Sequence, residues 1–282
     1  MPIGFARNYL RKRVTLSEDS GARRNRCSRR ISIRLWSSIN DNYRVITKEN
    51  NTQFFLEFSC HYLYNLLGDY MRLRKKHFAI PEMKENPYVF FETEGLKDRW
   101  QEIFGNNNEI RVELGAGKGE FLRQMALRHP DVNFVAFDKE TNAFIYASRK
   151  IKDNELNNVR AVAIDIEKID EVFNEDAVST IYINFCNPWP KPRQQKRRLT
   201  YPLFLERYKK FLKVGGKIYL KVDDRDLFEA SLDYFDECGF KCVFKTFDMK
   251  LEDFPDNIVT EYESKWRSID KPILYGIFER IN

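Results

Sequence analysis

Short apolar runs alternate with helix-like stretches along the chain from residue 110 onward. Each run is rich in residues that favour strands and is bounded by turn residues. In the stretches between the runs, apolar residues recur at the spacing of a helix. This alternation predicts an α/β fold with a doubly wound, mainly parallel sheet. Ligands of such sheets bind at the carboxyl ends of the strands. The expected strands are 110–114, 133–137, 159–164, 179–185 and 217–222, then 241–248 and 272–280, and the expected helices are 119–129, 140–152, 200–212 and 225–237.

The first 70 residues do not follow this pattern. Residues 1–36 are rich in Arg and Ser, lack a clear period, and hold ten basic against two acidic residues, a net charge of +8. We interpret them as disordered, and the more apolar residues 50–70 as suited to a short helix. The sequence therefore predicts an N-terminal extension, 1–70, that is largely disordered, and a folded domain, 71–282. Because the whole chain has a net charge of +6, RNA binding by the domain has to rest on local basic patches.

Composition and cysteine spacing exclude several classes of protein. An aromatic content of 15% is typical of a globular protein rather than a disordered one. The chain has no run of about 18 apolar residues, and its basic N-terminus lacks the apolar core and cleavage site of a secretory signal. The five cysteines form no C-x-x-C pair and no zinc-ligand spacing, which is typical of reduced thiols in the cytosol. We therefore expect a cytoplasmic protein without a membrane segment or a metal site.

A glycine-rich turn follows the first strand of the domain and indicates a cofactor. Gly115, Gly117 and Gly119 allow a tight turn and a close approach of a ligand to the backbone. A dinucleotide site would need a further glycine at the position of Glu120. A pyrophosphate would also meet the negative charge of Glu113, just before the turn. S-adenosylmethionine has no phosphate and carries a sulfonium cation, so these acidic residues favour it over a nicotinamide cofactor.

Two further acidic residues follow the next two strands. Asp138 is placed to accept hydrogen bonds from both ribose hydroxyls, as acidic residues do in nucleoside-binding folds. Asp165 is placed to meet the edge of the adenine. Each of them is alternatively a helix N-cap or a turn residue, and Glu113 a solvated charge at a strand end. Three acidic residues at three successive strand ends favour the nucleoside interpretation.

The sequence NFCNPWPKPRQQKRRLT, 184–200, follows the fourth strand and indicates the substrate. Asn184, Asn187 and Trp189 lie among prolines that restrict the loop. The basic residues behind them, next to an aromatic ring, provide what phosphate contacts and base stacking need. A solvated charge run is the alternative, but the position beside the cofactor turn favours RNA binding. The basic residues are Lys191, Arg193, Lys196, Arg197 and Arg198.

The segments VELGAGKGEF, NFCNPWPKPRQQKRRLT, KVDD and TEYE resemble the bacterial tRNA (guanine-N7-)-methyltransferase family, over about three-quarters of the chain from Met71. The resemblance implies a class I S-adenosylmethionine-dependent methyltransferase, with a Rossmann-like doubly wound sheet. It also implies methyl transfer to N7 of a guanine in the tRNA variable loop. The implied cofactor contacts are Glu113, Gly115, Gly117, Asp138, Asp165 and Asn187. The implied substrate contacts are Lys191, Asp223 and Thr260-Glu261-Tyr262-Glu263, with RNA contacts from residues 193–198.

The chain departs from this family in two places. The family usually has Asp where this chain has Asn187, at the position taken as catalytic, and residues 1–70 have no counterpart. Guanine N7 attacks through its lone pair and needs no general base, so catalysis is mainly alignment of the reacting atoms. A carboxylate would add stabilisation of the cationic purine, so Asn187 predicts a slower enzyme that is still active. Asp223, Glu261 and Glu263 remain as acceptors for guanine N1–H and the 2-amino group.

Three other functions compete with this prediction. The chain can bind RNA without methylating it, it can methylate a small molecule, or it can be a nicotinamide-dependent oxidoreductase. A small-molecule enzyme leaves the basic loop unexplained, and Glu120 disfavours the oxidoreductase. The sequence leaves the oligomeric state open between monomer and homodimer.

Overall fold

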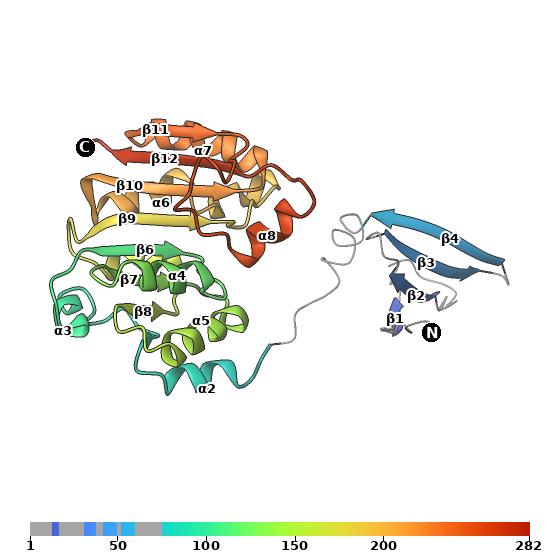
Figure 1. Ribbon diagram of the computed structural model, residues 1–282, viewed down its shortest axis with the longest axis horizontal. Helices are drawn as coiled ribbons and strands as arrows, with labels where there is room; N and C mark the ends of the chain where they lie inside the picture. The colour runs from blue at the N-terminus through green and yellow to red at the C-terminus, as the bar shows by residue number, and fades with distance from the viewer. Residues whose placement is uncertain (1–12, 17–30, 38–41, 50–51, 60–74) are drawn as a thin grey trace, which may run out of the picture. The chain divides into compact units, whose positions relative to one another are not determined.

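The chain divides into two compact units, Met1–Arg74 and Lys75–Asn282. A computed structural model describes residues 13–16, 31–37, 42–49, 52–59 and 75–282. In the first unit, four antiparallel strands pair in chain order (Figure 1). They are β1 (Arg13–Leu16), β2 (Ile31–Ser37), β3 (Asn42–Glu49) and β4 (Thr52–Ser59).

The short helix considered for residues 50–70 is wrong where the structure describes this segment. Thr52–Ser59 is a strand that pairs with β3 along its whole length. Its sequence TQFFLEFS places apolar residues at every second position, 54, 56 and 58. This two-residue period is typical of a strand rather than a helix. The predicted disorder of residues 1–70 falls mainly on residues outside the described ones. The four strands are the described part of that extension.

The second unit is built on one sheet of eight strands, in the order β11-β12-β10-β9-β6-β7-β8-β5. The strands from β5 to β10 are parallel, β12 is antiparallel to them, and β11, which pairs antiparallel with β12, runs in the same direction as β5 to β10. The prediction of a doubly wound, mainly parallel sheet is therefore confirmed. The strands are β5 (Val89–Phe90), β6 (Ile110–Leu114), β7 (Asn133–Phe137), β8 (Val159–Val162), β9 (Val178–Asn184), β10 (Leu212–Val222), β11 (Phe240–Thr246) and β12 (Leu274–Arg280).

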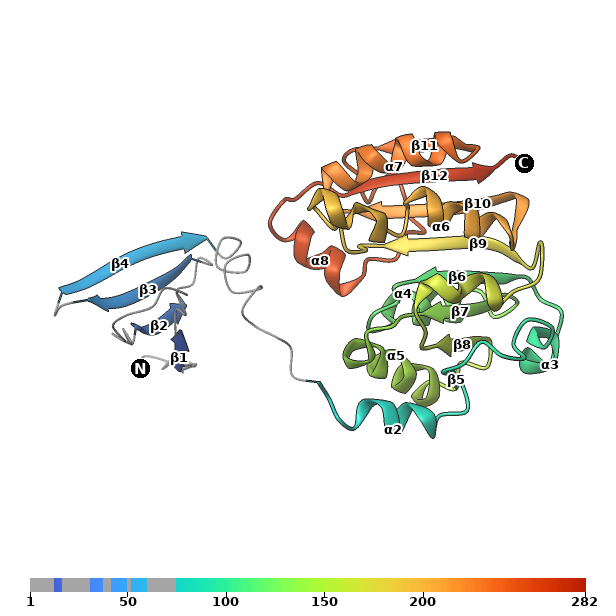
Figure 2. The same ribbon diagram turned by 180° about the vertical axis from the view of Figure 1, so that it is seen from behind.

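Helices cover both faces of this sheet (Figure 1 and Figure 2). One core cluster packs α2, α4 and α5 against the sheet, and another packs α3, η1, α6 and α7 against the other face. Alternate residues of β7 belong to the two clusters, which explains the continuous apolar sequence NFVAF. The helices are α2 (Ala79–Lys84), α3 (Trp100–Phe104), α4 (Glu120–Arg128), α5 (Thr141–Asp153), α6 (Pro202–Lys209), α7 (Arg225–Glu237) and α8 (Glu261–Arg267), with the 3-10 helices η1 (Ile166–Glu171) and η2 (Pro192–Arg197).

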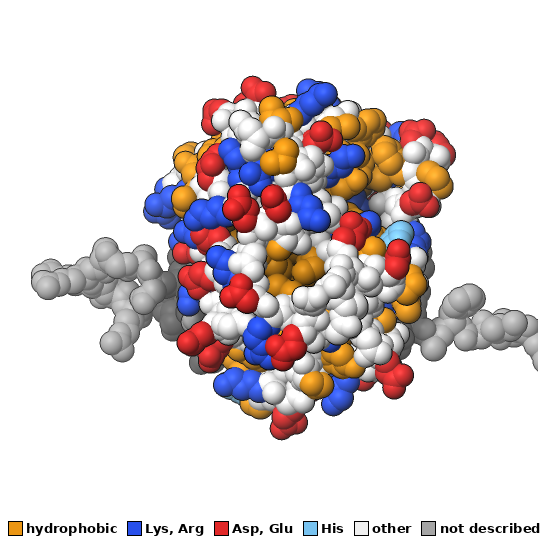
Figure 3. Space-filling model, turned by 90° about the vertical axis from the view of Figure 1, so that its left-hand side faces the viewer, with side chains coloured by type: hydrophobic (Ala, Val, Ile, Leu, Met, Phe, Trp, Pro, Cys, Tyr) orange, Lys and Arg blue, Asp and Glu red, His pale blue; other side chains and the backbone are white. Residues whose placement is uncertain are grey.

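The two ends of the parallel strands differ. The predicted cofactor and substrate residues follow the carboxyl ends, on the side of α8 in Figure 1. Figure 3 shows the opposite end, where the surface is hollowed and a cavity of about 220 Å³ is lined by Trp100, Asn133, Lys213 and the loop 106–109. In the described part of the chain, no helix is long and apolar enough to cross a membrane. The same residues contain no cluster of His, Cys, Asp and Glu suited to a metal ion.

Candidate active site

The glycine turn lies between β6 and α4 and is attached to the end of β7. The backbone N–H groups of Gly115 and Ala116 donate to the Phe137 carbonyl at 2.8 and 3.0 Å. Gly119 has a φ of +71°, and a Cβ there would lie 2.6 Å from Cβ of Ala147 on α5. Glycine at this position therefore allows both the left-handed turn and the close packing of α4 on α5. Gly115 and Gly117 also have positive φ angles.

Asp138 fastens this turn from the end of β7. Its Oδ2 accepts from the Gly117 N–H at 2.8 Å, and its Oδ1 accepts from the Glu140 N–H at 2.7 Å. Burial raises the pKa of the Asp138 carboxyl, and these two hydrogen bonds partly offset that rise. Each oxygen keeps a second lone pair, so Asp138 can support the turn and also accept from a ribose. The cofactor contact itself stays a prediction.

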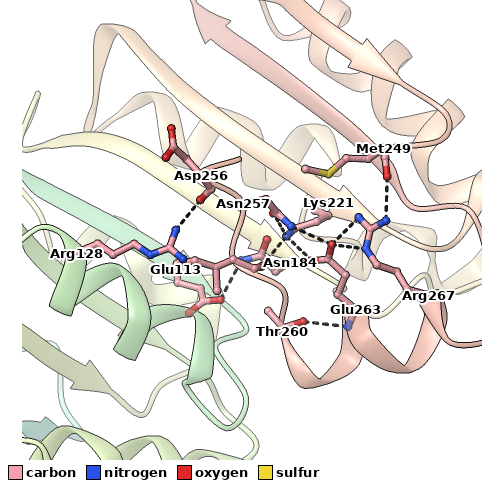
Figure 4. A network of polar contacts seen from close by, with 11 residues as sticks. Glu113, Arg128, Asn184, Lys221, Met249, Asp256, Asn257, Thr260, Glu263 and Arg267 are labelled. Carbon is pink, nitrogen blue, oxygen red and sulfur yellow. Dashed lines mark hydrogen bonds and ion pairs between the residues drawn. The ribbon is translucent and has the colours of Figure 1, made fainter. Parts of the chain in front are cut away.

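Glu113, at the end of β6, is a buried carboxyl with an unused acceptor. Glu113 is only 3% exposed, and its Oε1 accepts from Asn184 Nδ2 at 3.1 Å (Figure 4). Oε2 has no hydrogen-bond partner among the described residues. Burial raises the pKa of Glu113 to about 8, the negative charge of Asp138 adds to the rise, and the Asn184 hydrogen bond and Lys221 oppose it. A buried acceptor without a partner, beside the glycine turn, fits a ligand that brings a cationic donor such as the ammonium group of S-adenosylmethionine.

Asp165 is the N-cap of η1, which is the alternative to a cofactor contact that the sequence left open. Its Oδ1 accepts from the Glu167 N–H at 3.2 Å, and its Oδ2 lies 3.0 Å from Lys139 Nζ. Burial opposes ionisation of this carboxyl, but the Glu167 hydrogen bond and the Lys139 charge outweigh it and lower the Asp165 pKa. Part of the side chain is exposed at the rim of the site. The adenine contact stays a prediction.

The loop after β9 begins with two residues in unusual backbone conformations. Phe185 and Trp189 have φ angles of +50° and +44°, values that residues other than glycine rarely adopt. Asn187 lies between them, is exposed, and accepts the Trp189 N–H on Oδ1 at 3.0 Å. The Asn187 carbonyl thus closes a local turn. An Asp at this position would keep this bond with one oxygen and leave the other oxygen free.

Four of the five predicted basic residues are available to RNA. Lys191, Arg193, Lys196 and Arg197 are exposed on or beside η2, and the Arg197 guanidinium lies 5.2 Å from the centre of the Trp189 ring. Such a pair offers a positive charge beside an aromatic face. Arg198 differs, because it is 2% exposed and its Nε donates to the Pro188 carbonyl at 2.8 Å. The structure therefore corrects its predicted role: Arg198 holds the loop together from inside instead of presenting a charge to phosphate.

Asp223 follows β10 and is paired with a residue that we did not predict. Lys271 Nζ donates to Asp223 Oδ2 at 2.6 Å, and the same ammonium lies 4.0 Å from the centre of the Trp266 ring. Nearby in the fold, the rings of Phe185 and Tyr262 lie 5.3 Å apart. The loop after β9 and the first turn of α8 are thus in direct contact.

The TEYE segment forms the start of α8, and its members have different environments. Thr260 is the N-cap and accepts the Glu263 N–H at 3.0 Å, as in a capping box. Glu261 is exposed and pairs with Lys118 of the glycine turn at 2.7 Å, which lowers the Glu261 pKa through the hydrogen bond to that lysine. Tyr262 is 45% exposed.

Glu263 is fully buried, and its carboxylate is bound from three sides (Figure 4). Lys221 donates to Oε2 at 2.7 Å, and Asn257 and Arg267 donate to Oε1, the closest at 2.7 Å. Oε1 is thus fully used within the protein, whereas Oε2 accepts from Lys221 alone. The prediction that Glu263 accepts from guanine stays a prediction.

Comparisons with known proteins agree with this arrangement. A family model described as "Putative methyltransferase" matches residues 107–275. Proteins named tRNA (guanine-N(7)-)-methyltransferase from Clostridium tetani and Clostridium acetobutylicum are 49% and 48% identical to the chain, over 73% and 74% of it and 98% and 99% of the relatives. One from Desulfitobacterium hafniense is 44% identical over 74% of the chain and 98% of its own length.

Solved structures show the same fold at low identity. The 16S rRNA methyltransferase KamB has a TM-score of 0.52 at 14% identity, over 69% of this chain and 98% of that one. An antibiotic-related methyltransferase has a TM-score of 0.51 at 16% identity, over 65% and 94% of the two chains. The methyltransferase fold predicted from the sequence is confirmed, and the chain belongs to the bacterial tRNA (guanine-N(7)-)-methyltransferase family.

Proposed function

We propose that this protein transfers the methyl group of S-adenosylmethionine to N7 of a guanine in the variable loop of tRNA, in the cytoplasm. The observation that carries the proposal is the buried, unpartnered Oε2 of Glu113 beside the glycine turn. The next strand end carries the exposed basic helix η2, so a cation site and a phosphate-binding surface adjoin one another. Relatives named tRNA (guanine-N(7)-)-methyltransferase match the chain over nearly their whole length.

Each acidic residue at the strand ends has a distinct task in this proposal. Glu113 would bind the ammonium group of the cofactor, Asp138 its ribose and Asp165 its adenine. The cofactor, when bound, supplies a methyl group on a sulfonium cation, and transfer moves that positive charge onto the purine. Because N7 attacks with its own lone pair, the protein has to align the base and stabilise the cationic product.

Asp223 would accept hydrogen bonds from the guanine. Lys271 binds its Oδ2, which fixes the carboxylate and leaves Oδ1 to accept from N1–H and the 2-amino group. Asn187 would contribute its side-chain dipole near the reacting atoms. Lys191, Arg193, Lys196 and Arg197 would contact phosphates on either side of the guanine.

A nucleoside assay tests this function. Purified protein, S-adenosylmethionine and unmodified tRNA should yield 7-methylguanosine, detected by mass spectrometry after digestion. Guanine replaced by adenine at the modified position of the tRNA is the control, and it should give no product. Methylation of a different base or of a small molecule would contradict the proposal. Binding of tRNA without any methylation would favour the alternative of an RNA-binding protein.

Changing Asn187 to Asp is expected to preserve kcat or raise it by up to about tenfold, because a carboxylate stabilises the cationic purine better than an amide does. The turn should survive, since one carboxylate oxygen can still accept the Trp189 N–H. Asn184→Asp is the matched control: it would place a second carboxyl next to Glu113 and weaken cofactor binding. A large loss of kcat in Asn187→Asp, with cofactor binding intact, would show that the site is adapted to Asn.

Changing Lys196 and Arg197 to Ala is expected to weaken tRNA binding and to flatten its salt dependence. Each lost phosphate contact should reduce the slope of log K against log salt by about 0.9. The control pair is Lys97→Ala with Lys213→Ala, two exposed lysines next to α3 and at the start of β10. Filter binding over a range of salt concentrations measures both slopes. Equal slopes for the two double variants and the unchanged protein would mean that η2 is merely a solvated surface.

A further inference from the structure

Lys221 is a buried cation on β10, two positions before Asp223. It is 3% exposed, and its ammonium group donates to Asn257 Oδ1 at 2.8 Å, to the Ile258 carbonyl at 3.2 Å and to Glu263 Oε2 at 2.7 Å (Figure 4). All three donors of the ammonium are therefore used. The three acceptors belong to one segment, residues 256–263, which we call the substrate segment because it carries TEYE.

The far side of the substrate segment is fixed by the same network. Arg267 on α8 donates to Glu263 Oε1 through Nε and Nη2, and to the Met249 carbonyl through Nη1 at 3.0 Å. Asn257 joins Glu263 at 3.0 Å. Breaking one member would leave buried charges without partners, which is far more costly than losing a surface ion pair. The position of the substrate segment relative to β10 thus depends on Lys221.

The substrate segment also contacts the cofactor side of the site. Glu261 pairs with Lys118 of the glycine turn, and the Asp256 carbonyl accepts from Arg128 of α4 at 2.9 Å. Ile258 is buried in the core cluster that contains Ala116 of the glycine turn. One segment therefore lies between the strand that leads to Asp223 and the turn that would hold the cofactor.

The positive charge of Lys221 also influences the pKa of Glu113, the buried carboxyl beside the glycine turn. The charged groups that influence Glu113 are Asp138, whose negative charge raises the Glu113 pKa, and Lys221, whose positive charge lowers it, while Asn184 donates a hydrogen bond. The backbone gives a further link, because the Phe185 N–H, at the start of the loop after β9, donates to the Lys221 carbonyl at 2.7 Å.

We propose that Lys221 is a positioning residue for methyl transfer: it holds the substrate segment against β10 and the glycine turn. The inference rests on the proposed function, because it assigns Lys221 to the shared boundary of the cofactor and guanine sites. It predicts that a change at Lys221 affects both the binding of the cofactor and the use of tRNA.

The test compares Lys221→Met and Lys221→Arg with Lys217→Met. Lys217 is the matched control, since it is on the same face of β10 but 40% exposed, with Glu279 no closer than 4.0 Å. Lys221→Met is expected to raise KM for tRNA by about tenfold or more. It should also shift the pH dependence of S-adenosylmethionine binding upward, because Glu113 would ionise at a higher pH. Lys217→Met should change neither.

Lys221→Arg separates position from charge. It keeps the charge, and so the pH dependence of cofactor binding, but its planar fork cannot reproduce the three bonds of an ammonium, so KM for tRNA should still rise. If Lys221→Met does not fold, this variant decides alone. A lower melting temperature in both variants, with KM and the pH dependence unchanged, would overturn the proposal in favour of a structural role. Absence of methylation by the unchanged protein would instead refute the proposed function.

Discussion

Replacing Glu113 with Gln is expected to stabilise the cofactor-free protein above neutral pH. The pKa of this buried carboxyl is about 8 in the folded chain and 4.5 for the free group. A carboxyl whose folded pKa is raised contributes stability while it is protonated, and that contribution is lost as pH rises from the unfolded pKa through the folded one. The free energy of unfolding should fall by several kcal/mol over that range, on the order of 1.4 kcal/mol per pKa unit. Urea unfolding at a series of pH values should show this fall for the unchanged protein and a much smaller one for Glu113→Gln.

The same substitution is expected to weaken S-adenosylmethionine binding by about tenfold or more, because a charge-assisted hydrogen bond is worth about 1.5–3 kcal/mol. A cationic ligand binds the ionised carboxyl, so binding should release a proton below about pH 8. Calorimetry in buffers of different ionisation enthalpy measures that proton, and Glu113→Gln should lose it. Glu109→Gln, at the opposite end of the same strand and paired with Arg111 on the surface, should leave both values unchanged. Equal unfolding curves for Glu113→Gln and the unchanged protein would refute this account of Glu113.

Glu113 illustrates why a functional site departs from the rules that govern the rest of the fold. A buried acceptor without a partner costs stability, and an apolar side chain there would fold better. In the function that we propose, the cofactor completes the hydrogen bonds of this carboxyl. Lys221 is different, since its three hydrogen bonds, one of them to Glu263, are complete without any ligand, which agrees with the positioning role that we propose for it.

Much of the sheet could be predicted from the sequence, because its central strands are buried on both faces. The predicted strands 110–114 and 133–137 coincide with β6 and β7. The prediction for β10 was too short: it begins at Leu212 rather than at residue 217, since its pairing with β9 continues past Gly215 and Gly216 with a shift in register. The turn predicted at the glycines survives as an irregularity within the strand, because Gly215 has a φ of +77° and the register with β9 shifts between Leu212 and Lys217.

The candidate site was predicted less completely, because charge alone does not show whether a side chain is buried. Arg198 belongs to a run of basic residues that otherwise faces solvent, and its burial depends on the Pro188 carbonyl folding back onto it. Lys221 gave one signal, a lysine inside the apolar strand sequence KIYLKV. Its partners come from a distant part of the chain, so the sequence could not identify them.

Replacing Asp138 with Ala is expected to reduce S-adenosylmethionine affinity by between about tenfold and a hundredfold, since two acceptor functions are lost together. The ribose would lose its charged acceptor, and the glycine turn would lose the bond from the Gly117 N–H to Asp138. Asp165→Ala is the comparison at the next strand end, where the carboxylate caps η1 and pairs with Lys139 at the rim. A more exposed contact is worth less, so its loss should be only a few-fold.

Calorimetry of both Asp variants shows directly which of the two strand-end carboxylates contributes more to cofactor binding. Melting temperatures without cofactor control for a loosened turn, because a pure structural effect would lower stability without lowering the affinity of the folded protein. Asp138→Asn refines the result: its single carbonyl can still accept the Gly117 N–H, while its amide group would face the Glu140 N–H, so its affinity should lie between those of Asp and Ala. An affinity in Asp138→Ala equal to that of the unchanged protein, or a larger loss in Asp165→Ala, would mean that the ribose is bound elsewhere and that Asp138 serves the turn alone.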